Sequence, residues 1–252
     1  MNFQEALFKY LLILGDTSLI LGQRLSEWTG HGPFLEEDLA LTNIALDTIG
    51  HAKTLLEYAA KVENNGRDED ALAFFRSGRE FFNVKLVEQP NGNYADTIVR
   101  QVFMDAFRYH YYKALCNSKD QTLSALAQKA VKEVSYHYRH SSWWIKRFGD
   151  GTEESHYKAQ NAINNLWRFT GELFTPDESE KIMEEENIAP SLQNIEYLWK
   201  EDIYNLFKEA TLSIPENTYM QIGGKQGIHT EHLDYILAEM QSLPRMYPDA
   251  KW

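Results

Sequence analysis

The chain has 252 residues, of which 43% are hydrophobic and 25% charged, a composition typical of a soluble globular protein. Its formal net charge of −12 argues against nucleic acid and anionic lipid as partners, because such binding depends on Lys and Arg neutralising phosphate. Its one cysteine, Cys116, excludes an intrachain disulfide and a cysteine-based metal cluster. The apolar stretch from Leu11 to Leu21 is broken by Asp16, so neither a signal peptide nor a membrane span is predicted and a cytoplasmic location is expected.

Helical periodicity begins near the N-terminus. Seven positions recur at steps of four and three, which is typical of a bundle helix: Leu7, Leu11, Leu14, Ser18, Leu21, Leu25 and Trp28. The segment 30–33 is rich in glycine and ends at Pro33, so it ends this helix. A second helix is predicted from Pro33 to residues 64–66, and the three acidic residues of its first turn, 36–38, suit the positive end of a helix dipole.

The rest of the chain also has helical patterns. Residues 67–93 are irregular and aromatic, and we expect them to form a long crossover of the kind that ferritin-like bundles contain. Further helices are predicted at 93–116, 120–148, 152–170, shortly after 176, at 191–211 and at 230–243, with Pro244 and Pro248 ending the last one. No segment shows β alternation. The sequence therefore predicts one all-α domain of residues 1–252.

Two of these helices carry an incomplete metal motif. A di-iron bundle needs a Glu on each of two helices and a Glu-x-x-His motif on each of the other two. Asp47 is followed three residues later by Gly50, and Glu133 is followed by Tyr136. In both places the histidine comes one residue late, as His51 and His137. We interpret these as degenerate metal positions, and we expect Asp47 and Glu133 to face the bundle interior, where His51, His137 or a nearby Lys or Arg neutralises them.

Other residues leave alternatives open. Glu133, His137 and His140 lie on one helix face at i, i+4 and i+7, a spacing that could bind zinc. The remaining helices offer Asp16, Glu27 and Asp105 as carboxylates, each shorter than a di-iron Glu or out of register, with Arg24, Arg100 and Arg108 available as ion-pair partners. These sets predict either an active metal enzyme or buried polar networks.

A third set lies near the C-terminus. His229, Glu231 and His232 do not have zinc-peptidase spacing, because the histidines are three residues apart at a predicted helix start. We expect these three residues to serve capping, packing or partner contact. The glycines at 223, 224 and 227 follow no strand and lack the ending of a phosphate-binding loop.

Six segments in the same order resemble the C-subunit family of the bacterial phenylacetyl-CoA epoxidases, and the likeness extends over nearly the whole chain. They are Leu14 to Asp16, Gly22 to Trp28, Asp38 to Leu41, Leu86 to Asn93, Leu166 to Thr170 and Gly227 to Leu233. The resemblance implies a ferritin-like helical bundle with additional C-terminal helices. It also implies a component of an NADPH-dependent monooxygenase complex of aerobic phenylacetate catabolism.

In that family a di-iron subunit epoxidises the ring of phenylacetyl-CoA with dioxygen, and a reductase delivers electrons from NADPH. Members of the C-subunit family, which this chain resembles, are ferritin-like homologues of the di-iron subunit. They have lost the metal ligands, and they pair with the di-iron subunit. The resemblance therefore implies that this chain holds no cofactor or catalytic residue, that di-iron belongs to the catalytic partner subunit, and that other subunits and the reductase are further partners. An active di-iron or zinc enzyme that uses Glu133, His137 and His140 stays the alternative.

Overall fold

A computed structural model describes residues 1–248 and 250, and within them the regular structure is helical, without strands. The chain divides into two compact units. Unit 1 comprises Met1–Pro90, Asp177–Ser179 and Gly223–Trp252, and unit 2 comprises Asn91–Pro176 and Glu180–Ile222. This division does not say whether the units unfold together, so the single domain stays a prediction.

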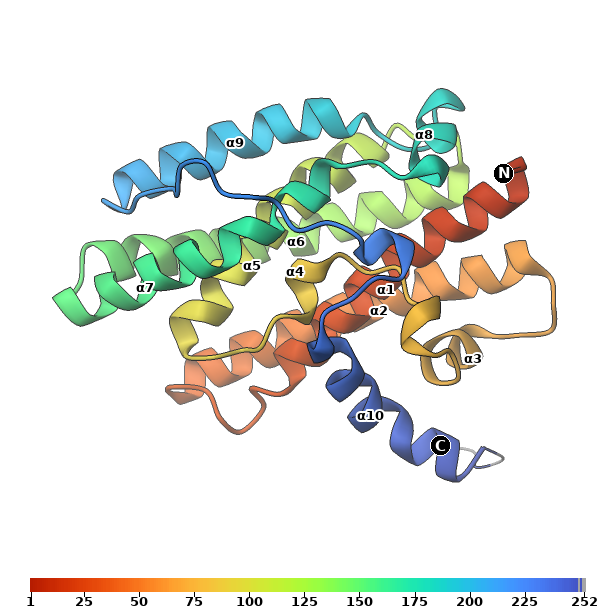
Figure 1. Ribbon diagram of the computed structural model, residues 1–252, viewed down its shortest axis with the longest axis horizontal. Helices are drawn as coiled ribbons and strands as arrows, with labels where there is room; N and C mark the ends of the chain where they lie inside the picture. The colour runs from red at the N-terminus through yellow and green to blue at the C-terminus, as the bar shows by residue number, and fades with distance from the viewer. Residues whose placement is uncertain (249, 251–252) are drawn as a thin grey trace. The chain divides into compact units, whose positions relative to one another are not determined.

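Unit 1 is built on two long helices, α1 (Phe3–Ser26) and α2 (Leu35–Glu63), which lie side by side (Figure 1). Asn2 begins α1 with a capping box, because its side chain accepts from the Glu5 N–H and the Glu5 side chain accepts in return. The two helices approach closely at Gly22, where an added Cβ would lie 2.6 Å from the Cγ1 of Ile49.

Short elements complete unit 1. The crossover between α2 and α5 contains α3 (Glu69–Phe74), the 3-10 turn η1 (Gly78–Glu80) and α4 (Lys85–Glu88), and η4 (Gly224–Gln226) precedes α10 (Glu231–Met246). The expected stop at Pro244 is wrong, because α10 continues to Met246. Pro244 removes one N–H donor in the last turn, so α10 loses a single hydrogen bond, to the carbonyl of Met240 one turn earlier.

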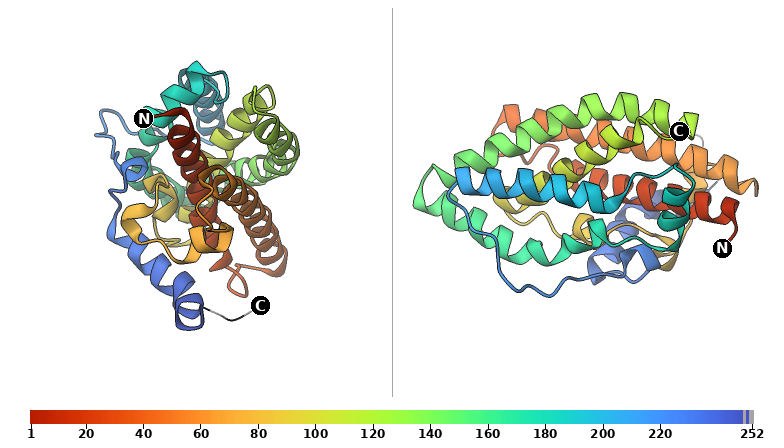
Figure 2. Two further views of the ribbon diagram at one scale, coloured as in Figure 1. Left: turned by 90° about the vertical axis from the view of Figure 1, so that its right-hand side faces the viewer. Right: turned by 90° about the horizontal axis from the view of Figure 1, so that it is seen from above.

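Unit 2 is built on α5 (Tyr94–Leu115) and α6 (Gln121–Gly149), which also lie side by side, with α7 (Glu153–Leu166) and α9 (Leu192–Glu209) packed on them (Figure 2). Asn93 and Asp120 cap the first two helices with their side chains, as expected from the sequence. Two 3-10 turns, η2 (Trp167–Phe169) and η3 (Gly171–Phe174), and α8 (Glu178–Glu185) connect α7 to α9.

An aromatic cluster forms the centre of unit 2. The ring of Phe103 lies between 5.7 and 5.8 Å from the rings of Trp167, Trp199 and Phe207, measured between centroids. The buried indole N–H of Trp199 donates to the Phe103 carbonyl at 2.9 Å, so the polar tip of this side chain is satisfied inside the unit. These four rings therefore serve to fill the core.

The predicted all-α, ferritin-like class is confirmed: each unit contributes one pair of long neighbouring helices, and the crossover comes where it was expected. No helix in residues 1–248 has the length and apolarity needed to cross a membrane.

Candidate functional site

The first degenerate motif lies in the middle of α2. His51 is buried with 4% of its surface exposed, while Asp47 is half-buried and Gly50 is exposed. A helix turns about 100° per residue, so the one-residue offset between Gly50 and His51 decides which position faces inward. Three residues before His51, in the position of a motif carboxylate, α2 carries the fully buried Thr48.

The second motif, on α6, repeats this arrangement. His137 is fully buried, whereas Tyr136 is 44% exposed. Glu133 is half-buried with its carboxylate 3.8 Å from the Nζ of Lys129, so it pairs with a surface lysine. Three residues before His137 the helix carries the fully buried Val134. In both units the inward histidine is present, and the residue one turn before it is not a carboxylate.

Asp16 on α1 is a fully buried carboxylate, and its partner is Arg76 from the crossover. The guanidinium donates to both oxygens, with Nη1 at 3.0 Å from Oδ2 and Nη2 bonded to Oδ1. The N–H of Phe82 donates to Oδ2 as well, at 2.9 Å. The guanidinium carbon of Arg76 lies 4.2 Å from the centre of the Phe81 ring, which fixes the plane of the fork.

Sequence reasoning missed Arg76 and offered Arg24 for this role. Arg24 instead pairs with Glu27 at 2.8 Å and donates to the Glu88 carbonyl. Arg76 follows a short helix in an irregular segment, where helical periodicity does not indicate whether a side chain points inward or outward. The adjacent pair Phe74-Phe75 is no guide to this burial, because Phe75 is 46% exposed.

Asp105 on α5 is the corresponding buried carboxylate of unit 2, and uncharged donors hold it. The Nε2 of Gln101 donates to one oxygen at 2.7 Å, and the Oγ of Ser141 donates to the other at 2.8 Å. Burial raises the pKa of Asp105 to about 7, against the lowering effects of the nearby Arg108 charge and of these two hydrogen bonds. The Ser141 Oγ also lies 3.1 Å from the His137 carbonyl within α6, and its bond to Asp105 joins α6 to α5.

A third buried carboxylate, Glu88, is the partner of His229, the histidine expected to pack at the start of the last helix. Its Oε1 lies 3.1 Å from the Nδ1 of His229, and its Oε2 accepts from the backbone N–H and hydroxyl of Thr230 at 3.0 and 2.9 Å. The Nε2 of His229 donates to the Phe81 carbonyl at 2.8 Å, since a carbonyl only accepts. A hydrogen bond between Nδ1 and the carboxylate then requires one more proton, on either His229 or Glu88.

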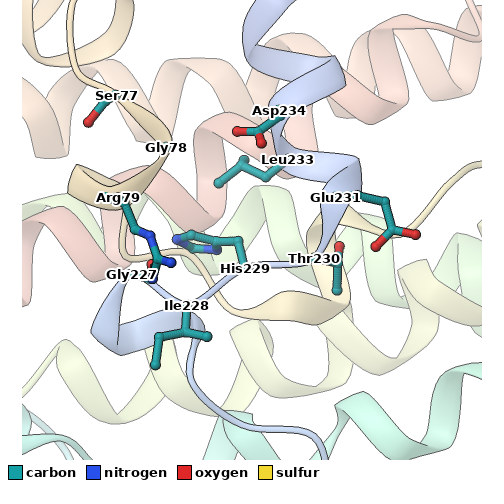
Figure 3. Close-up of a pocket in the computed structure, with 10 residues that line it drawn as sticks. All are labelled: Ser77, Gly78, Arg79, Gly227, Ile228, His229, Thr230, Glu231, Leu233 and Asp234. Carbon is teal, nitrogen blue, oxygen red and sulfur yellow. The ribbon is translucent and has the colours of Figure 1, made fainter.

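This cluster borders a cavity of about 270 Å³ next to α10 (Figure 3). Glu231 lines the cavity and is exposed, Thr230 is the N-cap residue of α10, and His232 is half-buried. Gly227 closes the wall with a φ of +75°, and an added Cβ there would lie 2.5 Å from the Arg79 carbonyl oxygen. Of the three residues expected at this helix start, His229 has a defined bonding role.

The side chains that the structure brings together do not fit a di-iron centre. The guanidinium of Arg76 already occupies both oxygens of Asp16, and Thr48 and Val134 offer no bridging carboxylate. In residues 1–248 and 250, no three side chains of His, Cys, Asp or Glu are grouped so that they could hold a metal ion. Glu133, His137 and His140 are therefore not such a group, although the absence of metal from the chain stays a prediction.

Fold and side chains define a class of protein: a ferritin-like helical chain whose buried carboxylates are held by protein groups. The chain belongs to a known family, since residues 2–252 match the model of the phenylacetic acid catabolic protein family. It is also 50% identical over 243 residues to the C subunit of the 1,2-phenylacetyl-CoA epoxidase of Escherichia coli K12, an alignment that covers 96% of this chain and 98% of that protein.

Proposed function

We propose that this chain is the structural, non-catalytic subunit of a phenylacetyl-CoA epoxidase, and that it pairs with the di-iron catalytic subunit of that monooxygenase. The similarity to the Escherichia coli epoxidase component over almost the full length of both chains supports this assignment. The proposal includes a reductase that delivers electrons from NADPH, and it keeps the cytoplasmic location expected from the sequence. Substrate oxidation then depends on iron in the partner.

The observation that carries the proposal is the fork between Arg76 and Asp16. A guanidinium and a metal cation compete for the same carboxylate lone pairs, and here both oxygens bond to the arginine. Removing Arg76 would leave a buried charge unpaired, so the arginine is part of the stable fold. Thr48 and Val134 point the same way, because these two buried positions, three residues before the inward histidines, hold no carboxylate that could bind a metal.

A surface for permanent pairing is available on α2. Leu35, Leu39 and Leu46 are 70%, 54% and 63% exposed, and their spacing of four and seven places them along one face of the helix. Isolated exposed leucines need no explanation, but a row of three on one helix is typical of a contact that is covered in an assembly. We assign this row, the α2 leucine row, to contact with the catalytic subunit.

The test is reconstitution from purified components. Catalytic subunit and reductase are assayed for NADPH consumption and epoxide formation with and without this chain, and iron is measured in each subunit after loading with ferrous ion. We expect turnover to require the chain, and the chain to retain far less than one iron. Turnover by the chain and reductase alone, or two irons bound per chain, would show that it is an oxygenase itself.

A paired variant tests the contact. Leu39→Glu/Leu46→Glu places two charges in the α2 leucine row and should prevent co-purification with the catalytic subunit. The matched control is Tyr157→Glu/Tyr197→Glu, which changes two apolar residues that are 67% and 70% exposed on α7 and α9. Equal loss of assembly in both variants would contradict the assignment of the row.

A further inference from the structure

Helix α6 carries an exposed row of charged and aromatic residues that neither the core nor the buried network uses. Lys132, Tyr136, Arg139, Trp143 and Arg147 are all exposed. Their spacing of four, three, four and four places them on one face of the helix, over roughly 22 Å at a rise of about 1.5 Å per residue. We call these five residues the α6 cationic stripe.

The stripe is organised by contacts between its own side chains. The guanidinium carbon of Arg147 lies 4.4 Å from the ring centre of Trp143, and that of Arg139 lies 5.6 Å from the ring centre of Tyr136. These cation–π contacts limit the freedom of both arginines while their N–H groups stay in water. Tyr136 and Trp143 remain 44% and 50% exposed, so the rings keep free faces.

Its charge contrasts with the rest of the molecule. Residues 129–147 contain five Lys or Arg and one Glu, in a chain whose formal net charge is −12. That Glu, Glu133, lies 3.8 Å from Lys129, outside the stripe. Within residues 1–248 and 250, no carboxylate forms an ion pair with Lys132, Arg139 or Arg147. The stripe is thus a local positive surface on an acidic protein.

The shape and surroundings of the stripe select a protein as its occupant. Small anionic ligands bind in concave sites that enclose most of their surface, whereas the stripe follows the outer face of a helix. A hollow of about 410 Å³ beside Arg139 is also lined by Asp202 and Glu209, which disfavour a phosphate there. Arg, Tyr and Trp are the residues that anchor protein interfaces, and the positive charge calls for carboxylates opposite them.

The charge of the stripe also separates it from the α2 leucine row. Permanent interfaces are large and apolar, while redox encounters are small and steered by charge. We infer that the α6 cationic stripe docks an acidic surface of a transiently binding protein, which in the complex of the proposed function is the reductase. This inference rests on the proposed function for the identity of the partner.

The experiment measures binding of the purified reductase to the immobilised chain at two salt concentrations. Charge-steered association is fast at low salt and slows as salt screens the charges, so we expect the wild-type on-rate to fall by about tenfold between 50 and 300 mM NaCl. Arg139→Glu/Arg147→Glu should lower the low-salt on-rate by at least about tenfold and remove its salt dependence. Trp143→Ala should instead raise the off-rate and leave the salt dependence intact.

The matched control is Lys119→Glu/Lys181→Glu, which changes the net charge by the same amount at two exposed lysines outside α6. Its on-rate should stay within about twofold of wild type, which separates local from overall charge. Thermal unfolding of each variant, followed by circular dichroism, checks that the helices remain folded.

Three results would overturn the inference: no binding of the reductase to the wild-type chain, equal on-rates for the stripe variant and the control, or loss of the catalytic subunit by the stripe variant alone. The last would place the stripe in the permanent interface. Failure of the wild-type chain to co-purify with the catalytic subunit would contradict the proposed function instead, and the binding measurement would still decide about the stripe.

Discussion

The two units solve one problem in two ways. Each contains an aspartate that is fully buried in the middle of a long helix, Asp16 on α1 in unit 1 and Asp105 on α5 in unit 2. Asp16 lies opposite a bidentate arginine, whereas Asp105 has uncharged donors and a pKa raised to about 7. Burial disfavours an ionised carboxylate in both places. A counter-ion offsets this cost at Asp16, and at Asp105 the raised pKa makes protonation easier.

This difference shows two ways in which a helical bundle accommodates a buried carboxylate. In neither place do several carboxylates share one cation, so each carboxylate is compensated on its own. Arg76 could reach Asp16 because the crossover passes beside α1. The side chains that donate hydrogen bonds to Asp105 come from α5 and α6 and are an amide and a hydroxyl, although the Arg108 charge is near. The way in which each buried aspartate is compensated therefore depends on which side chains lie within hydrogen-bonding distance of it.

The largest effect should come from removing the counter-ion in unit 1. Arg76→Met leaves the Asp16 carboxylate buried without its fork, which should lower the free energy of unfolding by about 3–5 kcal/mol. Urea unfolding at pH 7 measures this loss. The matched control is Arg67→Met, which breaks a partly exposed pair with Glu63 and should cost less than about 1 kcal/mol.

A double variant sharpens the same point. Asp16→Leu/Arg76→Met removes both charges, so it should be more stable than Arg76→Met alone. A double variant as unstable as the single one would show that the packing of the arginine on Phe81, and not its charge, holds this region.

In unit 2 the expected effect depends on pH. The folded pKa of Asp105, about 7, lies above its usual value near 3.8, so the folded state binds the additional proton. The contribution is fully present below about pH 4 and is lost as the pH rises to about 7, with no further change above. Asp105→Asn should remove this slope and be more stable than wild type at pH 8 by on the order of 3 kcal/mol.

The asparagine can be accommodated without a new unsatisfied group. Its oxygen accepts from Gln101, and its amide donates to Ser141, whose hydroxyl then turns to the His137 carbonyl 3.1 Å away. Unfolding free energies of both proteins are measured from pH 4 to pH 8. Parallel curves would show that Asp105 is ionised in the folded state throughout this range.

A smaller effect is expected at Glu88, whose Oε2 accepts two hydrogen bonds from Thr230. Thr230→Val removes the hydroxyl that donates to Oε2 and keeps the backbone N–H, so it should cost about 1–2 kcal/mol. The control is Thr54→Val, where an exposed hydroxyl bonds to the carbonyl one helical turn earlier and the change should stay within about 0.5 kcal/mol. Chemical denaturation measures both, and equal costs would contradict a buried bond at Glu88.

Much of the fold follows from local signals in the sequence. The Asn93 and Asp120 caps, the acidic first turn of α2 and the long crossover were all predictable because each depends on neighbouring residues. Pro244 was misjudged because the cost of a proline depends on its distance from the helix end, and packing on Ala73 and Arg76 through Gln241 holds α10 there. The helical periodicity of the sequence was sufficient to predict the all-α fold class.

The site was less predictable, because its bonds join residues far apart in the chain. The partners of Asp16 and Glu88 lie 60 and 141 residues away, at Arg76 and His229, in segments without regular periodicity. The incomplete motifs in the sequence drew attention to residues 47–51 and 133–137. Helical phase within a motif is sensitive to a single residue, so the spacing alone did not show that the histidines, and not Asp47 and Glu133, are the buried members.

The smallest expected effect tests that phase directly. Gly50 is exposed within α2, and an added Cβ there meets no atom within 4 Å, so Gly50→Ala should raise the free energy of unfolding by about 0.5–1 kcal/mol through reduced freedom of the unfolded chain. Gly22→Ala is the matched control on the facing side of α1, where the Cβ would meet Ile49 at 2.6 Å and overpacking should destabilise the protein by about 1–3 kcal/mol. Thermal unfolding of the two variants should therefore shift in opposite directions. A loss of stability in Gly50→Ala would mean that this position faces a packed interior, as a metal ligand would, and the inward phase now assigned to His51 would be wrong.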